Sequence, residues 1–158
     1  MSVAGYGVVM RLSANAPCPC GSGRKHKGCC GPLLDGAPAT SPEALMRSRY
    51  TAYVAGHVAH LQRTTLPGGP HWQADARAWG AELRAYCAAV NFEGLEVRET
   101  WTRGEDGGVT FYARLRHDGR DASFGEASTF RRVAGRWLYM DGVRIEDARG
   151  AAPRSGSR

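Results

Sequence analysis

Four of the five cysteines of this chain lie within the stretch CPCGSGRKHKGCC. One residue separates Cys18 from Cys20, and eight residues separate Cys20 from the adjacent pair Cys29 and Cys30. Four thiolates are a complete tetrahedral ligand set for zinc, and such a site is structural because no position remains for a substrate. The intervening glycines allow the chain to turn back, so that the two cysteine pairs can meet. We therefore predict a zinc site with Cys18, Cys20, Cys29 and Cys30 as ligands.

Two other uses of clustered cysteines fit this segment less well. Disulfides require an oxidising compartment, and a bridge between adjacent cysteines is strained. A redox pair usually has the form Cys-x-x-Cys before a helix, which is absent here. His26 is able to replace one thiol, although the four cysteines already complete the ligand set. Cys87 lies beside the apolar stripe of a predicted helix and is expected to be a small core residue.

The positive residues between the cysteine pairs predict a second role for the segment. A zinc ion with four thiolates has a formal charge of about −2, which Arg24, Lys25 and Lys27 help to offset. Lys25 and Lys27 are the only lysines of the chain, which otherwise uses arginine for positive charge. Lysine presents a compact and mobile charge. Together with His26, these residues are predicted to form a surface that binds a protein partner.

Composition and charge narrow the class of protein. The chain has 158 residues, of which 42% are hydrophobic and 23% charged, as in ordinary soluble globular proteins. No run of roughly eighteen apolar residues and no secretory signal is found, so we expect a cytoplasmic protein without a membrane partner. The net charge is +6, but the excess lies near the two ends, and residues 41–143 are nearly neutral. Nucleic-acid binding is therefore only a weak alternative, through the basic cysteine segment and the basic tail.

The chain divides by composition into five parts. The stretch GPLLDGAPATSP has the composition of a linker, and EDARGAAPRSGSR that of a disordered end. The predicted parts are an N-terminal arm (1–16), the cysteine segment or hook (17–32), a linker (33–41), an α+β body (42–146) and a basic tail (147–158).

Periodicity predicts helices followed by strands in the body. Thr40 or Ser41 is expected to cap a helix that begins at Pro42 and ends before Gly56. A short helix is expected in HVAHLQRTT and a longer one from about Gln73 to Asn91. Alternating residues then predict four strands, the first with one face formed by Leu95, Val97, Glu99 and Trp101. Helices before an antiparallel meander predict an α+β fold with the helices packed on one face of a curved sheet.

Polar residues on core-facing strand positions raise the question of an active site. Glu126 lies between Phe124 and Phe130, and Asp141 follows Tyr139 on one predicted face; these residues, Glu126, Asp141 and Tyr139, are the candidates. A carboxylate desolvated by aromatic rings can act as a general base. The alternative is that Glu126 or Glu99 pairs with Arg47 or Arg49 and only neutralises a buried charge. We favour this alternative, because no catalytic motif accompanies the carboxylates. The scattered histidines are expected at the surface or as caps: His57, His60, His71 and His117.

The cysteine segment CPCGSGRKHKGCCG resembles the SEC-C motif, a short zinc-binding hook found at the end of a bacterial secretion ATPase and in many otherwise unrelated proteins. In the ATPase the hook docks an export chaperone, so the resemblance implies a role in protein interaction. With the stretches ALMRSRYTAYVAGHVAHL and EASTFRRVAGRWLYMDG, the chain resembles the YchJ family. That resemblance implies a cone-shaped domain similar to nuclear transport factor 2 behind the hook.

These observations lead to one leading hypothesis and two alternatives. The leading hypothesis is a non-catalytic zinc protein that docks a protein partner through the hook. The first alternative is a small-molecule-binding protein or enzyme that uses the interior of the cone, and the second is a nucleic-acid binder. An open cavity with a carboxylate that lacks an ion pair favours the first alternative. A cone filled by Trp and Phe side chains favours the leading hypothesis.

Overall fold

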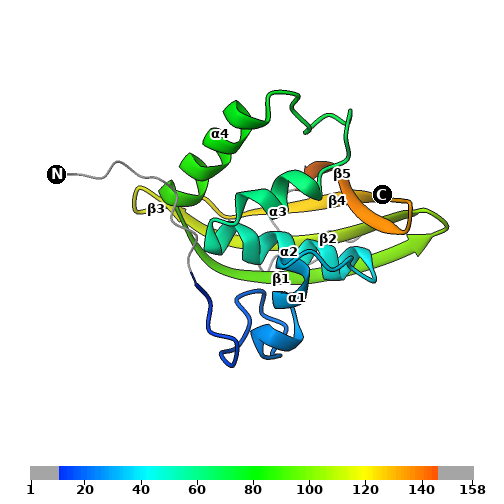
Figure 1. Cartoon of the computed structure of the whole chain (residues 1–158). Helices are drawn as coiled ribbons and strands as arrows, with labels where there is room; N and C mark the ends of the chain where they lie inside the picture. Colours follow the sequence, from blue (N-terminus) through cyan, green and yellow to red (C-terminus); the bar gives the residue numbers. More distant parts are fainter. Residues whose placement is uncertain (1–10, 146–158) are drawn as a thin grey trace, which may run out of the picture.

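A computed structural model describes residues 11–145 as helices packed on one antiparallel sheet, preceded by the hook (Figure 1). The predicted tail at 147–158 and the first ten residues of the predicted arm lie outside the described residues. The elements are η1 (His26–Gly28), α1 (Gly31–Leu34), α2 (Pro42–Ala55), α3 (Val58–Arg63), α4 (Ala76–Ala89), β1 (Val90–Arg103), β2 (Asp106–His117), β3 (Arg120–Asp121), β4 (Phe124–Val133) and β5 (Arg136–Ile145).

The sheet has the order β1-β2-β4-β5, with the two-residue β3 paired to β2, and all pairings between these strands are antiparallel. Helices α2, α3 and α4 lie over one face of the sheet, and the hook lies beside the edge formed by β1 (Figure 1). This arrangement confirms the predicted α+β class and the meander of strands. Between residues 11 and 145, no helix is long and apolar enough to cross a membrane.

Helix α2 begins and ends where its sequence predicts. The Ser41 hydroxyl accepts a hydrogen bond from the Ala44 backbone N–H at 3.0 Å, and Pro42 occupies the first turn, where no N–H is needed. Gly56 ends the helix with a φ of +73°, a left-handed conformation that favours glycine. The capping signals in the sequence are therefore sufficient to define this helix, which contacts both the hook and the sheet.

Helix α4 is shorter than the predicted range of Gln73 to Asn91. The Asp75 carboxylate accepts a hydrogen bond from the Ala78 N–H at 3.0 Å and caps the helix, which starts at Ala76. At the other end Val90 is already strand, paired with His117 in β2. Val90 fits the helical stripe equally well, so periodicity alone does not reveal the change to strand.

Two register shifts alter the predicted strand faces. The first lies between Val97 and Glu99: Val97 pairs with the buried Phe111, whereas Trp101 pairs with Gly108 and is 46% exposed. A Cβ atom at Gly108 would collide with the Trp101 indole, so this glycine makes room for the ring on the outer face. The prediction that Glu99 and Trp101 share the face of Val97 is therefore wrong, because an extra residue moves both to the other side.

The second shift lies in β5, between the pairs Thr129–Asp141 and Phe130–Tyr139. As a result Gly142, rather than Asp141, pairs with the buried Ser128. The predicted common face of Tyr139 and Asp141 is therefore also wrong. The bulge leaves a glycine opposite Ser128 on the side of the sheet that the helices cover.

Candidate functional site

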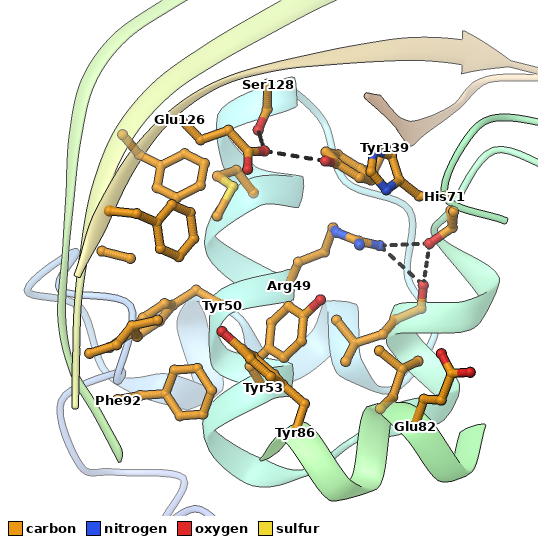
Figure 2. Close-up of a pocket in the computed structure, with 18 of the residues that line it drawn as sticks. Arg49, Tyr50, Tyr53, His71, Glu82, Tyr86, Phe92, Glu126, Ser128 and Tyr139 are labelled. Atoms are coloured by element: carbon orange, nitrogen blue, oxygen red, sulfur yellow. Dashed lines mark hydrogen bonds between the residues drawn. The ribbon is translucent and has the colours of Figure 1, made fainter. Parts of the chain in front are cut away.

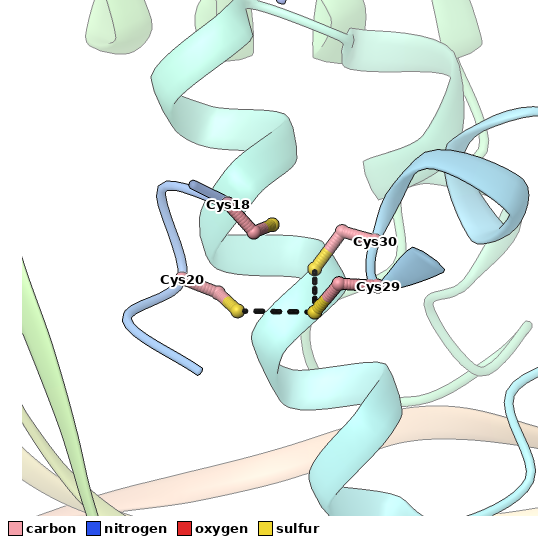
Figure 3. A group of neighbouring side chains, drawn as sticks. All are labelled: Cys18, Cys20, Cys29 and Cys30. Atoms are coloured by element: carbon pink, nitrogen blue, oxygen red, sulfur yellow. Dashed lines mark hydrogen bonds between the residues drawn. The ribbon is translucent and has the colours of Figure 1, made fainter. Parts of the chain in front are cut away.

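The hook brings its two cysteine pairs together by a short pairing of its own backbone. The Cys18 N–H donates to the Arg24 carbonyl at 2.8 Å, and the His26 N–H donates to the Ala16 carbonyl at 2.9 Å. Gly21 and Gly23 have φ values of +79° and +86°, the left-handed conformations that turn the chain between these strands. The turn carries Cys18 and Cys20 on one side, facing Cys29 and Cys30 (Figure 3).

The four sulfur atoms are spaced as ligands of one tetrahedral metal ion. All four lie within 4.8 Å of one another, with 3.5 Å between the sulfurs of Cys20 and Cys29 and 3.9 Å between those of Cys29 and Cys30. Zinc–sulfur bonds of about 2.3 Å place tetrahedral sulfurs roughly 3.8 Å apart. A disulfide requires about 2.05 Å, and all five cysteines of the chain are free. The donor set and its spacing fit a tetrathiolate metal site.

The groups around the four sulfurs act on them in different directions. The Ser22 hydroxyl lies 3.1 Å from the Cys29 sulfur, and the Thr51 hydroxyl from helix α2 lies 3.7 Å from that of Cys18. Interaction with the thiols of Cys20 and Cys30 lowers the pKa of Cys18 to about 3, and the same kind of interaction raises the pKa of Cys30. Four sulfurs this close cannot all ionise without a cation between them, which is the requirement that a metal ion meets.

The structure removes His26 from the predicted partner-binding residues. Its side chain is only 9% exposed, and its Nδ1 lies 3.6 Å from the Cys18 sulfur. It therefore supports the metal site from inside the hook. Arg24, Lys25 and Lys27 are exposed, and an Arg24 N–H lies 3.9 Å from the Cys29 sulfur. Three of the four predicted docking side chains thus face solvent.

The hook packs directly on helix α2. Buried Cys18, Cys20 and Cys30 belong to the same apolar cluster as Leu45 and Tyr50 of that helix. The Arg47 guanidinium donates to the Cys20 carbonyl at 2.8 Å, which ties the helix to the backbone of a predicted ligand. The cysteine cluster is therefore continuous with the core of the body.

A cavity of about 460 Å³ lies between the helices and the sheet (Figure 2). Its walls are mainly aromatic. Its polar side chains come from α2, α4, β4, β5 and the segment after α3, and they are Arg49, Thr65, His71, Gln73, Glu82, Glu126, Ser128, Tyr139 and Arg144. His71, Glu82 and Tyr86 are exposed, so the opening lies between α4 and the segment that precedes it. Trp79 and Phe111 line this space without filling it.

Glu126 projects into the cavity and accepts hydrogen bonds from two hydroxyls. The Ser128 O–H donates to Oε2 at 2.6 Å, and the Tyr139 O–H donates to the same oxygen at 3.2 Å (Figure 2). Burial, with a further contribution from Glu126, raises the pKa of Tyr139 well above its usual range, so this phenol remains a donor. A Cβ atom at Gly142 would collide with the Glu126 carboxylate. Gly142 is therefore a site residue, and only the register shift of β5 reveals it.

The predicted ion pair between a strand carboxylate and an α2 arginine does not form. Arg47 pairs with Glu43 at 2.9 Å, and Glu99 is exposed on the outer face. Arg49 donates instead to neutral oxygens of Leu61, Thr64 and Thr65, and its Cζ lies 4.6 Å from the Tyr139 ring centroid. Within residues 11–145, Glu126 has no ion pair. The prediction fails because the Tyr139 side chain lies between the carboxylate and the guanidinium.

Asp141 and the histidines occupy other environments. Asp141 accepts a hydrogen bond from the Gly142 N–H and from His71 Nε2 at 2.9 Å, which lowers its pKa, and it lies at the cavity rim. His57 caps α3, as expected for one of these residues, and His117 is exposed. His60 differs from the prediction, because it is 2% exposed and bonds Ser48 in α2.

Comparisons with known proteins agree with both parts of the chain. Residues 15–32 match the SEC-C motif family, and residues 41–142 match the family described as YchJ, middle NTF2-like domain. The UPF0225 protein SG1365 of Sodalis glossinidius is 41% identical over 150 residues, which cover 90% of this chain and 92% of that protein.

Two solved structures of SEC-C motif proteins have the same fold. The solution structure of RPA3114 from Rhodopseudomonas palustris is 36% identical, has a TM-score of 0.72, and is matched over 83% of this chain and 100% of that one. The crystal structure of a SEC-C motif protein from Psychrobacter arcticus is 24% identical with a TM-score of 0.67, over 87% of each chain. The second likeness bears on the fold alone.

Proposed function

Because this chain belongs to the YchJ family, with a SEC-C motif before an NTF2-like domain, we propose that it is a zinc protein whose hook docks an acidic protein partner. The observation that carries the proposal is the convergence of four sulfurs at tetrahedral spacing beneath an exposed basic loop. Zinc is the ion whose common structural sites consist of four thiolates. Cys18, Cys20, Cys29 and Cys30 hold the ion in this proposal, and the cytoplasm keeps them reduced.

The exposed cations supply the docking surface. Arg24 lies close enough to Cys29 to offset the charge of the metal centre, whereas Lys25 and Lys27 have no described ion pair. Their charges extend into solvent, where they can attract carboxylates of a partner and increase its rate of association. In this proposal the metal ion fixes the conformation of the loop, and the two lysines bind carboxylates of the partner.

The test is a double charge reversal, Lys25→Glu with Lys27→Glu. We expect the variant to retain about one zinc per chain by elemental analysis, because the lysines are not ligands. Acidic proteins captured from cell lysate by the wild type should fall by about fivefold or more in quantitative mass spectrometry. The matched control is Arg103→Glu with Arg120→Glu, which reverses two exposed charges away from the hook. Full retention of these proteins by the lysine variant, or loss of its zinc, would reject the docking role.

The cavity supports a second candidate function, the binding of a small molecule inside the cone. It remains open between aromatic walls, and Glu126 has hydroxyl partners and no described ion pair. An open cavity with a carboxylate that lacks an ion pair favours ligand binding. We propose Glu126, Ser128 and Tyr139 as its polar contacts. No reaction is proposed, because no known catalytic motif accompanies these groups.

A further inference from the structure

Arg49 is a buried cation with no carboxylate in direct contact among residues 11–145, and Glu126 acts on it only from beyond ion-pair distance. Only 8% of the residue is exposed, and burial lowers its pKa. One of its nitrogens, Nη1, donates to the Leu61 carbonyl and to the hydroxyls of Thr64 and Thr65. These neutral acceptors fix the position of the guanidinium. A buried charge without a counter-ion is unfavourable, so its retention points to a partner that arrives from outside.

The other two guanidinium nitrogens of Arg49 border the cavity. The hydrogen bonds of good geometry are all made by Nη1, and the Tyr53 hydroxyl also interacts with the guanidinium. Among the described residues, no fully buried side-chain nitrogen or oxygen lacks a hydrogen-bond partner, so Nε and Nη2 are not sealed from the cavity. These N–H groups therefore face open space, and Arg49 is one of the residues that line the cavity. Two adjacent N–H donors on a planar guanidinium match the two oxygens of a carboxylate.

The surroundings hold the guanidinium rigidly enough to serve as an anchor. Thr64 accepts a hydrogen bond from the Tyr139 N–H at 2.7 Å, and Leu66 donates to the Tyr139 carbonyl at 2.8 Å, so the segment that binds Nη1 is fixed to β5. The Arg49 Cζ lies over the Tyr139 ring. An anion placed at Nε and Nη2 would thus meet a donor pair that is already in position, which lowers the entropy cost of binding.

Glu126, which lies at the hydroxyl end of Tyr139, is the polar group that the other end of a ligand would contact. The Tyr139 ring stacks against Arg49, and its hydroxyl contacts Glu126, so about the length of one aromatic ring separates the two charges. Oε1 of Glu126 has no described hydrogen-bond partner, and the residue is partly exposed to the cavity. A ligand atom at this end is expected to be a hydrogen-bond donor.

We propose that the cavity binds a small carboxylic acid with an apolar body, its carboxylate on Arg49 and a hydroxyl or amino donor on Glu126. The assignment rests on the second candidate function above, and it adds the chemical class of the ligand. Tyr53, Phe92 and Phe111 supply the apolar walls, and the space exceeds that needed for a single benzene ring. Arg144, whose Cζ lies 3.8 Å from the Phe124 centroid, is a second cation on the lining.

The test uses matched probes on the zinc-loaded full chain. 4-Hydroxyphenylacetate carries both polar groups across one ring, its methyl ester lacks the negative charge, and phenylacetate lacks the donor. By isothermal titration calorimetry we expect the acid to bind about tenfold more tightly than the ester and about fivefold more tightly than phenylacetate. Equal affinity of acid and ester would overturn the assignment to Arg49 while leaving a cavity that binds small molecules. Failure of all three probes to bind would overturn both proposals.

Variants then locate the two contacts. Glu126→Gln keeps the volume of the side chain, and it should reduce the preference for 4-hydroxyphenylacetate over phenylacetate to about twofold or less. Arg49→Lys keeps a charge but loses the paired donors, so the preference for acid over ester should fall by about fivefold. Thermal unfolding establishes that each variant is folded. If Arg49→Lys does not fold, the ester comparison on the wild type still decides the anion assignment. Unchanged preferences in folded variants would contradict it.

Discussion

At the scale of single residues, His60 has a defined protonation state because of its neighbours. The imidazole is 2% exposed between α2 and α3. An Arg63 N–H lies 3.2 Å from Nδ1, and arginine can only donate, so Nδ1 accepts and Nε2 carries the proton. Nε2 donates to the Ser48 hydroxyl at 2.8 Å, and that hydroxyl donates to the Leu45 carbonyl. The sequence contains no sign of this chain of bonds, because HVAHLQRTT does not reveal which helical face packs inward.

Burial of His60, with the charges of Arg63 and Arg49, lowers its pKa from 6.5 to about 3. Below pH 6.5 the unfolded chain binds a proton that the folded chain does not, so stability falls as the pH decreases from 6.5 towards 3. The slope from this residue is at most about 1.4 kcal/mol per pH unit. We expect His60→Gln, which can keep a donor for Ser48, to flatten the loss of stability between pH 6.5 and about 4.5 in urea unfolding.

In the proposed zinc form, protonation of the cysteines would also destabilise the fold in acid, and it would affect wild type and variant equally. The comparison therefore isolates His60. Parallel stability curves for the two proteins over this pH range would mean that His60 is protonated in the folded state as easily as in the unfolded chain.

At the scale of elements, α2 separates the two candidate sites. Successive helical residues are rotated by about 100°, so residues two apart point in nearly opposite directions. Arg47 and Thr51 contact the hook, whereas Arg49 and Tyr53 line the cavity. One helix thus supplies a wall of the cavity with one face and the base of the metal centre with the other.

The capping residues and apolar periodicity of α2 were sufficient to predict it, and the four strands followed from alternation. In β1 the faces of the residues after Val97 could not be predicted, because a register shift follows Val97. In β5 the face of Asp141 could not be predicted, because a register shift separates it from Tyr139. A bulge depends on how two strands pair, and alternation within one strand does not encode it. The proximity of the four cysteines could be predicted from their spacing, because all four lie in one short segment. The separation of Glu126 from Arg49 could not, because it depends on tertiary structure.

Packing of the hook on α2 predicts that metal and body are coupled. Removal of zinc by a chelator should lower the melting temperature of the whole chain by about 5 °C or more, because three buried cysteines belong to the same cluster as Leu45 and Tyr50. The far-ultraviolet circular dichroism of the sheet should persist below that temperature, since most members of this cluster come from α2 and the strands. Adding zinc back should restore the original transition. An unchanged melting temperature in protein shown to be metal-free would mean that the stability of the body does not depend on the metal in the hook.

At the scale of the whole molecule, the two candidate sites lie in different places and differ in the positive charge around them. The hook lies beside the β1 edge (Figure 1). The cavity has Glu82 and Tyr86 of α4 at its opening. Several surface arginines of the sheet form ion pairs, among them Arg116 with Glu93, Arg131 with Asp106, and Arg132 with Glu105. Uncompensated charge in the hook is limited to a few side chains. A small cluster of this kind can select an acidic protein surface, but it provides few contacts to a phosphate backbone.

This distribution of charge predicts that nucleic acids, the third candidate class of partner, bind weakly and that their affinity depends only slightly on salt. Three exposed cations, Arg24, Lys25 and Lys27, limit the slope of log K against log salt to about −3 from the hook. Fluorescence anisotropy with a labelled duplex, titrated between about 50 and 200 mM salt, measures the slope directly. Lys25→Glu with Lys27→Glu should reduce its magnitude by about 2, and removal of residues 147–158 measures the share of the basic tail. Submicromolar binding at the higher salt with a slope steeper than about −6 would require a continuous basic face on the folded body. The ion pairs of Arg116, Arg131 and Arg132 reduce the positive charge that such a face could use.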